Sequence, residues 1–237
     1  MAQQDDLFHL GHRERLREKF LDDKLNDSEK LELLLSFAIP RRDVRPLSRK
    51  LIQHFGGLYY VIIATYEDLV AIPGVGRSTA ILIKLVCSML EISHHKVLQT
   101  ESVFYNPKAL EEFCRMQMAS KTSEELHVLY LDNNLRLVEH EVHSRGSIES
   151  TNIYPDMIVR KAVKNSVRSI VLLHNHPITD NMFSTQDIEA TENLIALLNV
   201  FKLELYDHYV VASGILYSMR AMGLLNRSSF SCAQKLV

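Results

Sequence analysis

Residues 167–187, VRSIVLLHNHPITDNMFSTQD, decide the fold of the second half of this chain. The apolar opening of this stretch predicts a buried strand over Val167–Leu173. Because side chains alternate between the faces of a strand, His174 and His176 leave its end on the same face. Pro177 has no N–H to donate to a sheet, so the strand stops there. The sequence therefore places two imidazoles side by side at a strand end.

A helix is expected over Ser184–Asn199, with Ser184 as the N-cap and Asp187 in the first turn. The helix dipole favours a carboxylate there, and Asp187 is expected to meet both histidines. Taken singly, Ser184 and Asp187 are better interpreted as capping residues. The combined pattern H-x-H-P-x6-S-x2-D favours one divalent ion per chain, most simply Zn²⁺, held by His174, His176 and Asp187. Three protein ligands leave the fourth position open, as in catalytic zinc sites.

The flanking sequence alternates between helical and strand patterns and predicts an α/β (α+β) domain with a mixed sheet. Helices are expected at Pro107–Ala119 and Pro155–Asn165. Strands are expected at Leu126–Leu131, Leu135–Val142, Leu203–Val211 and Ile215–Ser218.

The first part of the chain predicts a small all-α domain over residues 1–92. Helices are expected at Arg13–Phe20, from Asn26–Ser28 to Ala38, at Val44–His54 and at Arg77–Ile92, the last with Ile81, Leu82, Leu85, Met89 and Leu90 turned inward. Residues 93–106 show no clear period and are interpreted as a linker, with a poorly patterned helix as the alternative. Residues 107–237 then form the metal-binding domain.

Bulk properties narrow the function classes. The chain has 237 residues, 46% of them hydrophobic, and a net charge of -2, so as a whole it is not an electrostatic DNA or membrane binder. Three scattered cysteines do not suggest a disulfide framework. No signal peptide and no apolar stretch long enough to span a bilayer is evident, so we expect a soluble, cytoplasmic protein without membrane contact.

Residues 71–80, AIPGVGRSTA, look like a helix-hairpin-helix element. Glycines in such a turn expose backbone N–H groups beside a helix N-terminus, which can hold a phosphate oxygen. Gly74, Val75, Gly76 and Arg77 are therefore candidates for contact with the DNA backbone, with Lys84 adding charge. The alternative is a plain helix connector, because the first 100 residues carry 14 basic and 13 acidic side chains. Gly56–Gly57 is interpreted as a helix stop.

The metal motif resembles the signature of the JAMM (MPN+) metallopeptidases, and most of the chain resembles one bacterial branch, the RadC family, long labelled DNA repair proteins. The resemblance includes GHRERL at 11–16, AIPGVG at 71–76, LDN at 131–133 and LYDH at 205–208. It implies a zinc-dependent hydrolase acting on a peptide or isopeptide bond of a protein or peptide substrate. Glu125 would be its general base, with neighbouring Glu124 easily confused with it, and Ser184 would donate to the oxyanion.

Some positions depart from the branch's usual pattern, notably Ile178–Thr179 and Ile153–Met157, and these put the substrate in doubt but not the ion. His208 is interpreted either as a residue that orients the site or as a structural histidine. Two other functions remain open. One is a DNA-associated accessory or repair protein with a structural or vestigial metal site. The other, ranked last, is a metal-dependent nuclease, since many such enzymes use two ions.

Overall fold

The computed structural model describes residues 2–119, 121–146, 153–177 and 182–225, so Ile178–Thr179 lie outside the described residues. The chain divides into two compact units, Met1–Leu90 and Glu91–Val237. The division falls inside helix α6, Arg77–Thr100. Residues 93–100, expected to belong to a linker, are therefore helical, as in the alternative interpretation. Among the described helices, none is both long and apolar enough to cross a membrane.

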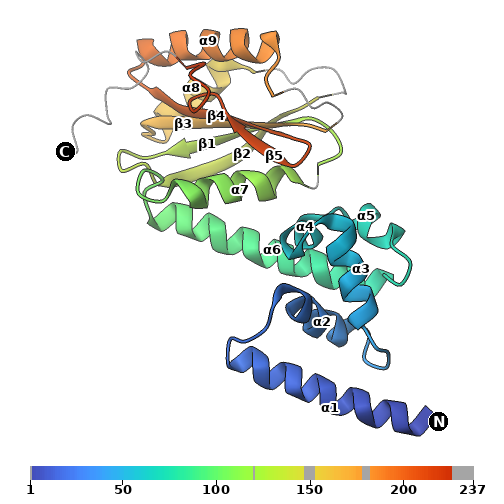
Figure 1. Ribbon diagram of the computed structural model, residues 1–237. Coiled ribbons are helices and arrows are strands. Elements are labelled where there is room, and N and C mark those ends of the chain that lie inside the picture. The colour runs from blue at the N-terminus through green and yellow to red at the C-terminus, as the bar shows by residue number, and fades with distance from the viewer. Residues whose placement is uncertain (1, 120, 147–152, 178–181, 226–237) are drawn as a thin grey trace. The chain divides into compact units, whose positions relative to one another are not determined.

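The first unit is built from helices, as expected, around a core that includes Leu31, Leu51, Leu69 and Ile83. An Asn26 capping box starts α2, and Gly56, with φ of 87°, ends α3, which confirms its interpretation as a helix stop. The helices before α6 are α1 (Ala2–Leu21), α2 (Asp27–Ala38), α3 (Arg45–Phe55), α4 (Leu58–Ile63) and α5 (Tyr66–Ala71) (Figure 1).

The inward face expected for α6 is wrong. The buried positions of this helix are Thr79, Ala80, Ile83, Cys87 and Leu98, whereas Ile81 and Leu85 are each 49% exposed. Met89 and Leu90 are exposed as well. Residues 80–90 are apolar on nearly every side, so the 3.6-residue period alone does not select the buried stripe.

The second unit holds a five-stranded sheet with the order β2-β1-β3-β4-β5. Strands β3 and β4 are parallel and the other pairs are antiparallel, so the sheet is mixed, as expected. Helix α7 covers one face, and α8 and α9 cover the other (Figure 1). The bounds are α7 (Pro107–Ala119), β1 (Glu125–Leu131), β2 (Leu137–Arg145), α8 (Pro155–Lys164), β3 (Ser169–His176), α9 (Thr185–Val200), β4 (Glu204–Ala212) and β5 (Ile215–Ser218).

Alternate side chains of the central strands supply two separate cores. On the α7 face, Leu129 and Leu131 of β1 pack with Phe113 of α7. On the opposite face, Val128 of β1 packs with Ile158 of α8 and Leu194 of α9. All residues of β1 and β3 are buried, which agrees with strands covered on both faces. This alternation decides which residues can reach the candidate site.

Candidate metal centre

Two imidazoles and one carboxylate converge where strand β3 ends and helix α9 begins. His174 Nε2 lies 3.0 Å from His176 Nε2 and 3.3 Å from Asp187 Oδ1. His176 Nε2 lies 3.5 Å from Asp187 Oδ2. Both histidines are buried, and the Asp187 side chain is 20% exposed. The expected meeting of the strand end and the helix start is present.

These separations fit a shared zinc ion. Bonds of about 2.0–2.2 Å at tetrahedral angles place ligand atoms roughly 3.3 Å apart. The two histidine nitrogens lie 3.0 Å apart, and each lies close to one oxygen of the Asp187 carboxylate, His174 at 3.3 Å from Oδ1 and His176 at 3.5 Å from Oδ2. Within the described part of the chain, this is the one group of three or more His, Cys, Asp or Glu residues whose ligand atoms lie mutually within 4.8 Å.

Asp187 is held in place by the capping box of α9. Its Oδ2 accepts hydrogen bonds from the Ser184 amide at 2.7 Å and the Ser184 hydroxyl at 2.6 Å. The Asp187 amide in turn donates to Ser184 Oγ at 3.1 Å. Burial raises the pKa of the Asp187 carboxyl, but the adjacent His174 and His176 imidazoles and the Ser184 hydroxyl outweigh it and hold that pKa well below its usual range. Asp187 is therefore a carboxylate, as a metal ligand must be.

A chain of hydrogen bonds behind the histidines assigns the tautomer of His174. The Thr191 hydroxyl donates to the Asp187 carbonyl at 2.5 Å, so its oxygen accepts from His208 Nδ1–H at 2.8 Å. Burial lowers the pKa of His208, which keeps its ring neutral, so His208 Nε2 has a lone pair. That atom lies 2.8 Å from His174 Nδ1, which must therefore be the donor. His174 Nε2 then presents its lone pair to the centre, as a metal ligand requires.

The structure places Glu125 on the wrong face of the sheet for its expected role as general base. Leu126 pairs directly with His174, so these two share a face and Glu125 points to the other one. The Glu125 carboxylate there contacts His127 Nε2 at 2.9 Å, Lys121 Nζ at 3.0 Å and Arg145 Nε at 3.2 Å. Burial raises the pKa of Glu125, but hydrogen bonds from His127 and Lys121 prevail and hold it at about 2. These contacts engage Glu125 on the face of the sheet away from His174.

Glu124 precedes Leu126 by two residues, the spacing at which strand side chains share a face. It lies directly before β1, and its carbonyl accepts from the Gly146 amide at 3.0 Å, which extends the pairing of β1 by one residue. The alternation of the strand, continued to this position, predicts that Glu124 shares the face of Leu126 and His174. Asn175 holds the backbone on both sides of Glu124. Its Oδ1 accepts from the Glu125 amide at 2.9 Å, and its Nδ2 donates to the Ser123 carbonyl at 3.0 Å. Asn175 is 2% exposed, so these bonds are sheltered from water.

Sequence reasoning missed two contributors to this centre, Asn175 and Thr191, and it missed the contacts of His127 with Glu125 on the opposite face of the sheet. Asn175 lies inside the quoted motif, and its position between two ligands on a strand could have suggested contact with the neighbouring strand. Thr191 lies one helical turn after Asp187, a spacing that places both on one side of α9. His127 forms a hydrogen bond to Glu125 and, through Nδ1, another to His140 at 2.9 Å. That last pairing has no signal in the sequence.

The candidate hairpin residues form a turn between α5 and α6. Gly74 has a φ of 106°, Val75 is buried and donates to the Ile72 carbonyl at 3.0 Å, and α6 starts at Arg77. Lys84, expected to add charge, donates through its ammonium to the Ala64 carbonyl at 2.9 Å and keeps its positive charge.

Comparison with known proteins agrees with both halves of the structure. Residues 104–224 match the family described as RadC-like JAB domain, and residues 61–86 match the helix-hairpin-helix motif. A UPF0758 protein of Ruegeria pomeroyi is 34% identical over 218 residues, which cover 90% of this chain and 97% of that relative. The name of that relative states no activity.

Proposed function

The chain belongs to the RadC family, and from that premise we propose that it is a zinc-dependent hydrolase of the JAMM type, cleaving a peptide or isopeptide bond. The observation that carries the proposal is the convergence of His174, His176 and Asp187 at separations of 3.0–3.5 Å. Two nitrogens and one carboxylate oxygen suit zinc and leave a fourth position for water or substrate. A zinc ion bound there would lower the pKa of a coordinated water and polarise a carbonyl oxygen.

Glu124 is proposed as the general base in place of Glu125. It would accept a proton from the attacking water and return it to the leaving amine nitrogen. Support comes from the pairing of Leu126 with His174, whose alternation predicts the same face for Glu124, and from the Asn175 side chain, which holds the backbone of Ser123 and Glu125 on either side. Glu125, with a pKa of about 2 and three cationic or imidazole partners, suits that task poorly.

Ser184 is proposed as the donor to the developing oxyanion. Its hydroxyl now donates to Asp187 Oδ2 at 2.6 Å, so it sits beside the three ligands but is already engaged. The hydroxyl rotates about a single bond and can redirect its hydrogen to a substrate oxygen while the Ser184 amide, at 2.7 Å, keeps hold of Asp187. Ser184 therefore serves both as helix cap and as catalytic donor.

The test combines metal content with hydrolysis. Purified protein is analysed for bound zinc and assayed with an internally quenched peptide library and with a peptide carrying an isopeptide-linked lysine. The His174→Ala, His176→Ala double variant should contain less than a tenth of the parental zinc and show no hydrolysis. Zinc retained at parental stoichiometry in that variant would refute the assignment of the centre.

Two adjacent glutamates provide a matched pair for the general base. Glu124→Gln should keep zinc and lose hydrolysis by about 10²–10⁴-fold, the usual contribution of general base catalysis. Glu125→Gln, one residue away, should keep both zinc and most of the activity. The opposite result would restore Glu125 as the general base. It would also show that the alternation of side chains along β1 does not decide which glutamate acts as the base.

A second candidate function is contact with the DNA backbone through the hairpin turn of Gly74, Val75, Gly76 and Arg77. It is favoured by the match to the helix-hairpin-helix motif over residues 61–86. The two functions occupy different units and do not exclude each other. Loss of DNA retention in an Arg77→Ala variant, with full retention in the His174 variant, would support this contact.

A further inference from the structure

The GHRERL segment supplies a brace for a loop of the first unit, and no part of the proposed centre explains it. Arg13 of α1 donates through its guanidinium to the carbonyl oxygens of Pro40, of Ile39 at 3.0 Å and of Arg42 at 2.7 Å. A planar guanidinium offers its donors in a fixed fork, so three acceptors on one loop define the shape of that loop. Residues 39–43, between α2 and α3, are thereby held in one conformation.

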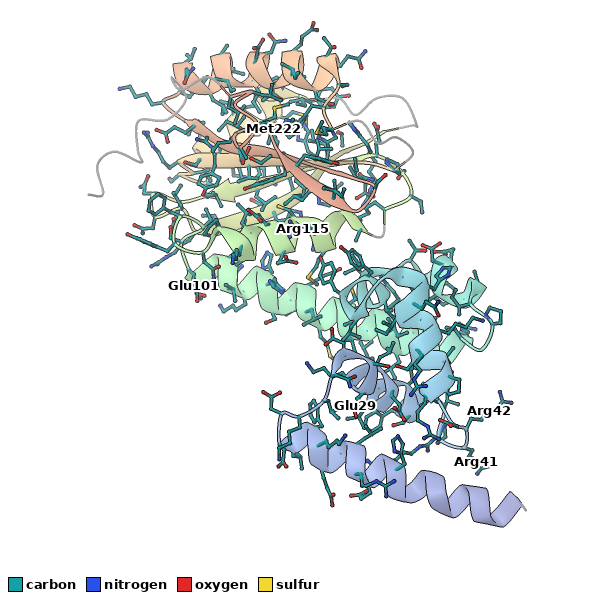
Figure 2. The ribbon with its side chains drawn as sticks, in the orientation of Figure 1. Glu29, Arg41, Arg42, Glu101, Arg115 and Met222 are labelled. Carbon is teal, nitrogen blue, oxygen red and sulfur yellow. The ribbon has the colours of Figure 1, made fainter. Side chains whose placement is uncertain are left out.

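This braced loop and the helix after it carry a concentration of positive charge. Arg41, Arg42, Arg49 and Lys50 are exposed, and among the residues that the structure describes none of these four forms an ion pair. Figure 2 shows Arg41 and Arg42 on the loop between α2 and α3. Arg45 is different, because Asp43 neutralises it through contacts as short as 2.6 Å.

The charge is local and not a property of the unit as a whole. Residues 41–50 contain five basic side chains and one acidic side chain, whereas the first 100 residues contain 14 and 13. Outside this short segment the same region is therefore acidic on balance. An average over the first 100 residues conceals this local excess of positive charge.

Two of the cationic residues, Arg49 and Lys50, line a groove beside the hairpin turn. The groove has a volume of about 460 Å³ and is lined by Asp43, Arg45, Pro46, Arg49, Lys50 and Gln53. Lys50 Nζ lies 3.5 Å from the Pro73 carbonyl oxygen. A Cβ built on Gly74 would lie 3.2 Å from the Leu47 side chain, so α3 and the turn are in close contact. The groove and the hairpin therefore form one continuous surface.

We propose that this surface, consisting of Arg41 and Arg42 on the braced loop and of Arg49 and Lys50 at the groove, binds the phosphate backbone of duplex nucleic acid alongside the hairpin turn. The proposal rests on the hairpin contact of the second candidate function and is independent of the hydrolase. A backbone is a continuous line of anions, so it can engage the turn amides and the neighbouring cations together, whereas a single small anion reaches only one of them. Contacts of this kind position the duplex and do not read its sequence.

The experiment measures binding of the full chain to a fluorescein-labelled 20-base-pair duplex by anisotropy, over a series of NaCl concentrations. The parent should show an affinity that falls steeply with salt. The Arg41→Ala, Arg42→Ala variant should bind more weakly, and its log–log salt slope should be shallower by about 1.8, or about 0.9 for each phosphate that is no longer neutralised. Arg49→Ala should reduce the slope by about half that amount.

The control variant removes two positive charges, as the Arg41, Arg42 variant does, but from the second unit. Arg160→Ala, Lys164→Ala changes two exposed cations of α8 in the other unit and should leave affinity and slope unchanged. If the control weakens binding as much as the Arg41, Arg42 variant does, net charge explains the effect and the proposal fails. If only Arg77→Ala loses binding, the hairpin contact stands and the cationic surface is refuted. No binding by the parent, or equal competition by polyglutamate, also overturns the proposal.

Discussion

Thr191 offers the sharpest test of how the centre is assembled. Replacing it with valine keeps the side-chain volume and removes the hydroxyl that accepts from His208 Nδ1–H at 2.8 Å. The neutral His208 ring is then more stable with its proton on Nε2, because that atom lies 2.8 Å from His174 Nδ1 and can donate a hydrogen bond to it. His174 must in response carry its proton on Nε2, the atom needed for the metal. Binding zinc would require reversing both proton positions.

The expected effect follows from the usual weight of such orienting partners. Loss of one typically weakens metal affinity by about 10–100-fold, or roughly 1.4–2.7 kcal/mol. If the ring of His208 does not change tautomer, its Nδ1–H stays buried without an acceptor, and the free energy of unfolding of the metal-free protein falls by about 1–3 kcal/mol. Either response is measurable, and both arise from a residue that does not touch the ion.

Zinc affinity is measured by competition with a chromophoric chelator, and ¹⁵N chemical shifts of the histidine rings report the tautomers directly. Thr191→Ser keeps the hydroxyl and serves as the control, with near-parental affinity. Thr191→Val should bind zinc at least tenfold more weakly. Equal zinc affinity for the valine and serine variants, with unchanged ring nitrogen shifts, would refute the assignment of the His174 tautomer.

Three further predictions follow from the contacts described. Asn175→Ala should retain zinc but lose most hydrolysis and about 2–4 kcal/mol of unfolding free energy, because two buried hydrogen bonds disappear; parental rates in an assay paired with urea unfolding would contradict this. Burial raises the pKa of Glu125, but His127 and Lys121 hold it at about 2 against an ordinary 4.5. Its stabilisation, on the order of 2 kcal/mol, should be full above pH 4.5 and disappear as pH falls toward 2. Melting temperatures at pH 7 and 3 should therefore differ less in Glu125→Gln than in the parent. Arg13→Ala should lower the free energy of unfolding by about 1–3 kcal/mol, and an unchanged urea midpoint would show that the brace is dispensable.

The main features of the centre could be predicted from local sequence because they depend on short-range geometry. Alternation along a strand aligns His174 with His176, and capping chemistry directs Asp187 back toward the strand end. The strand Ile215–Ser218 and the helix Pro107–Ala119 have the predicted bounds for the same reason. These features need a few neighbouring residues and no knowledge of the partner strand.

Features that depend on register could not be predicted. Glu124 and Glu125 differ by one position, and a shift of one residue moves a strand side chain to the other face of the sheet. Only the pairing of Leu126 with His174 settles which glutamate shares the face of the ligands. The buried stripe of α6 was missed for a related reason, because its many apolar residues allow several rotations of the helix about its axis. Contacts with distant parts of the chain, and not composition, decide both the face of the glutamates and the buried side of α6.

The His174–Asn175–His176 segment has a consequence for any attempt to redesign this protein. Three consecutive side chains perform two tasks on opposite sides of one strand, since the outer two face the ligand cluster while the middle one fastens the adjoining strand. An insertion or deletion within this tripeptide would exchange the tasks, sending an imidazole to the fastening side and the amide to the cluster. Transplanting the centre to another scaffold therefore demands the neighbouring strand with its register, and two histidines alone would be insufficient.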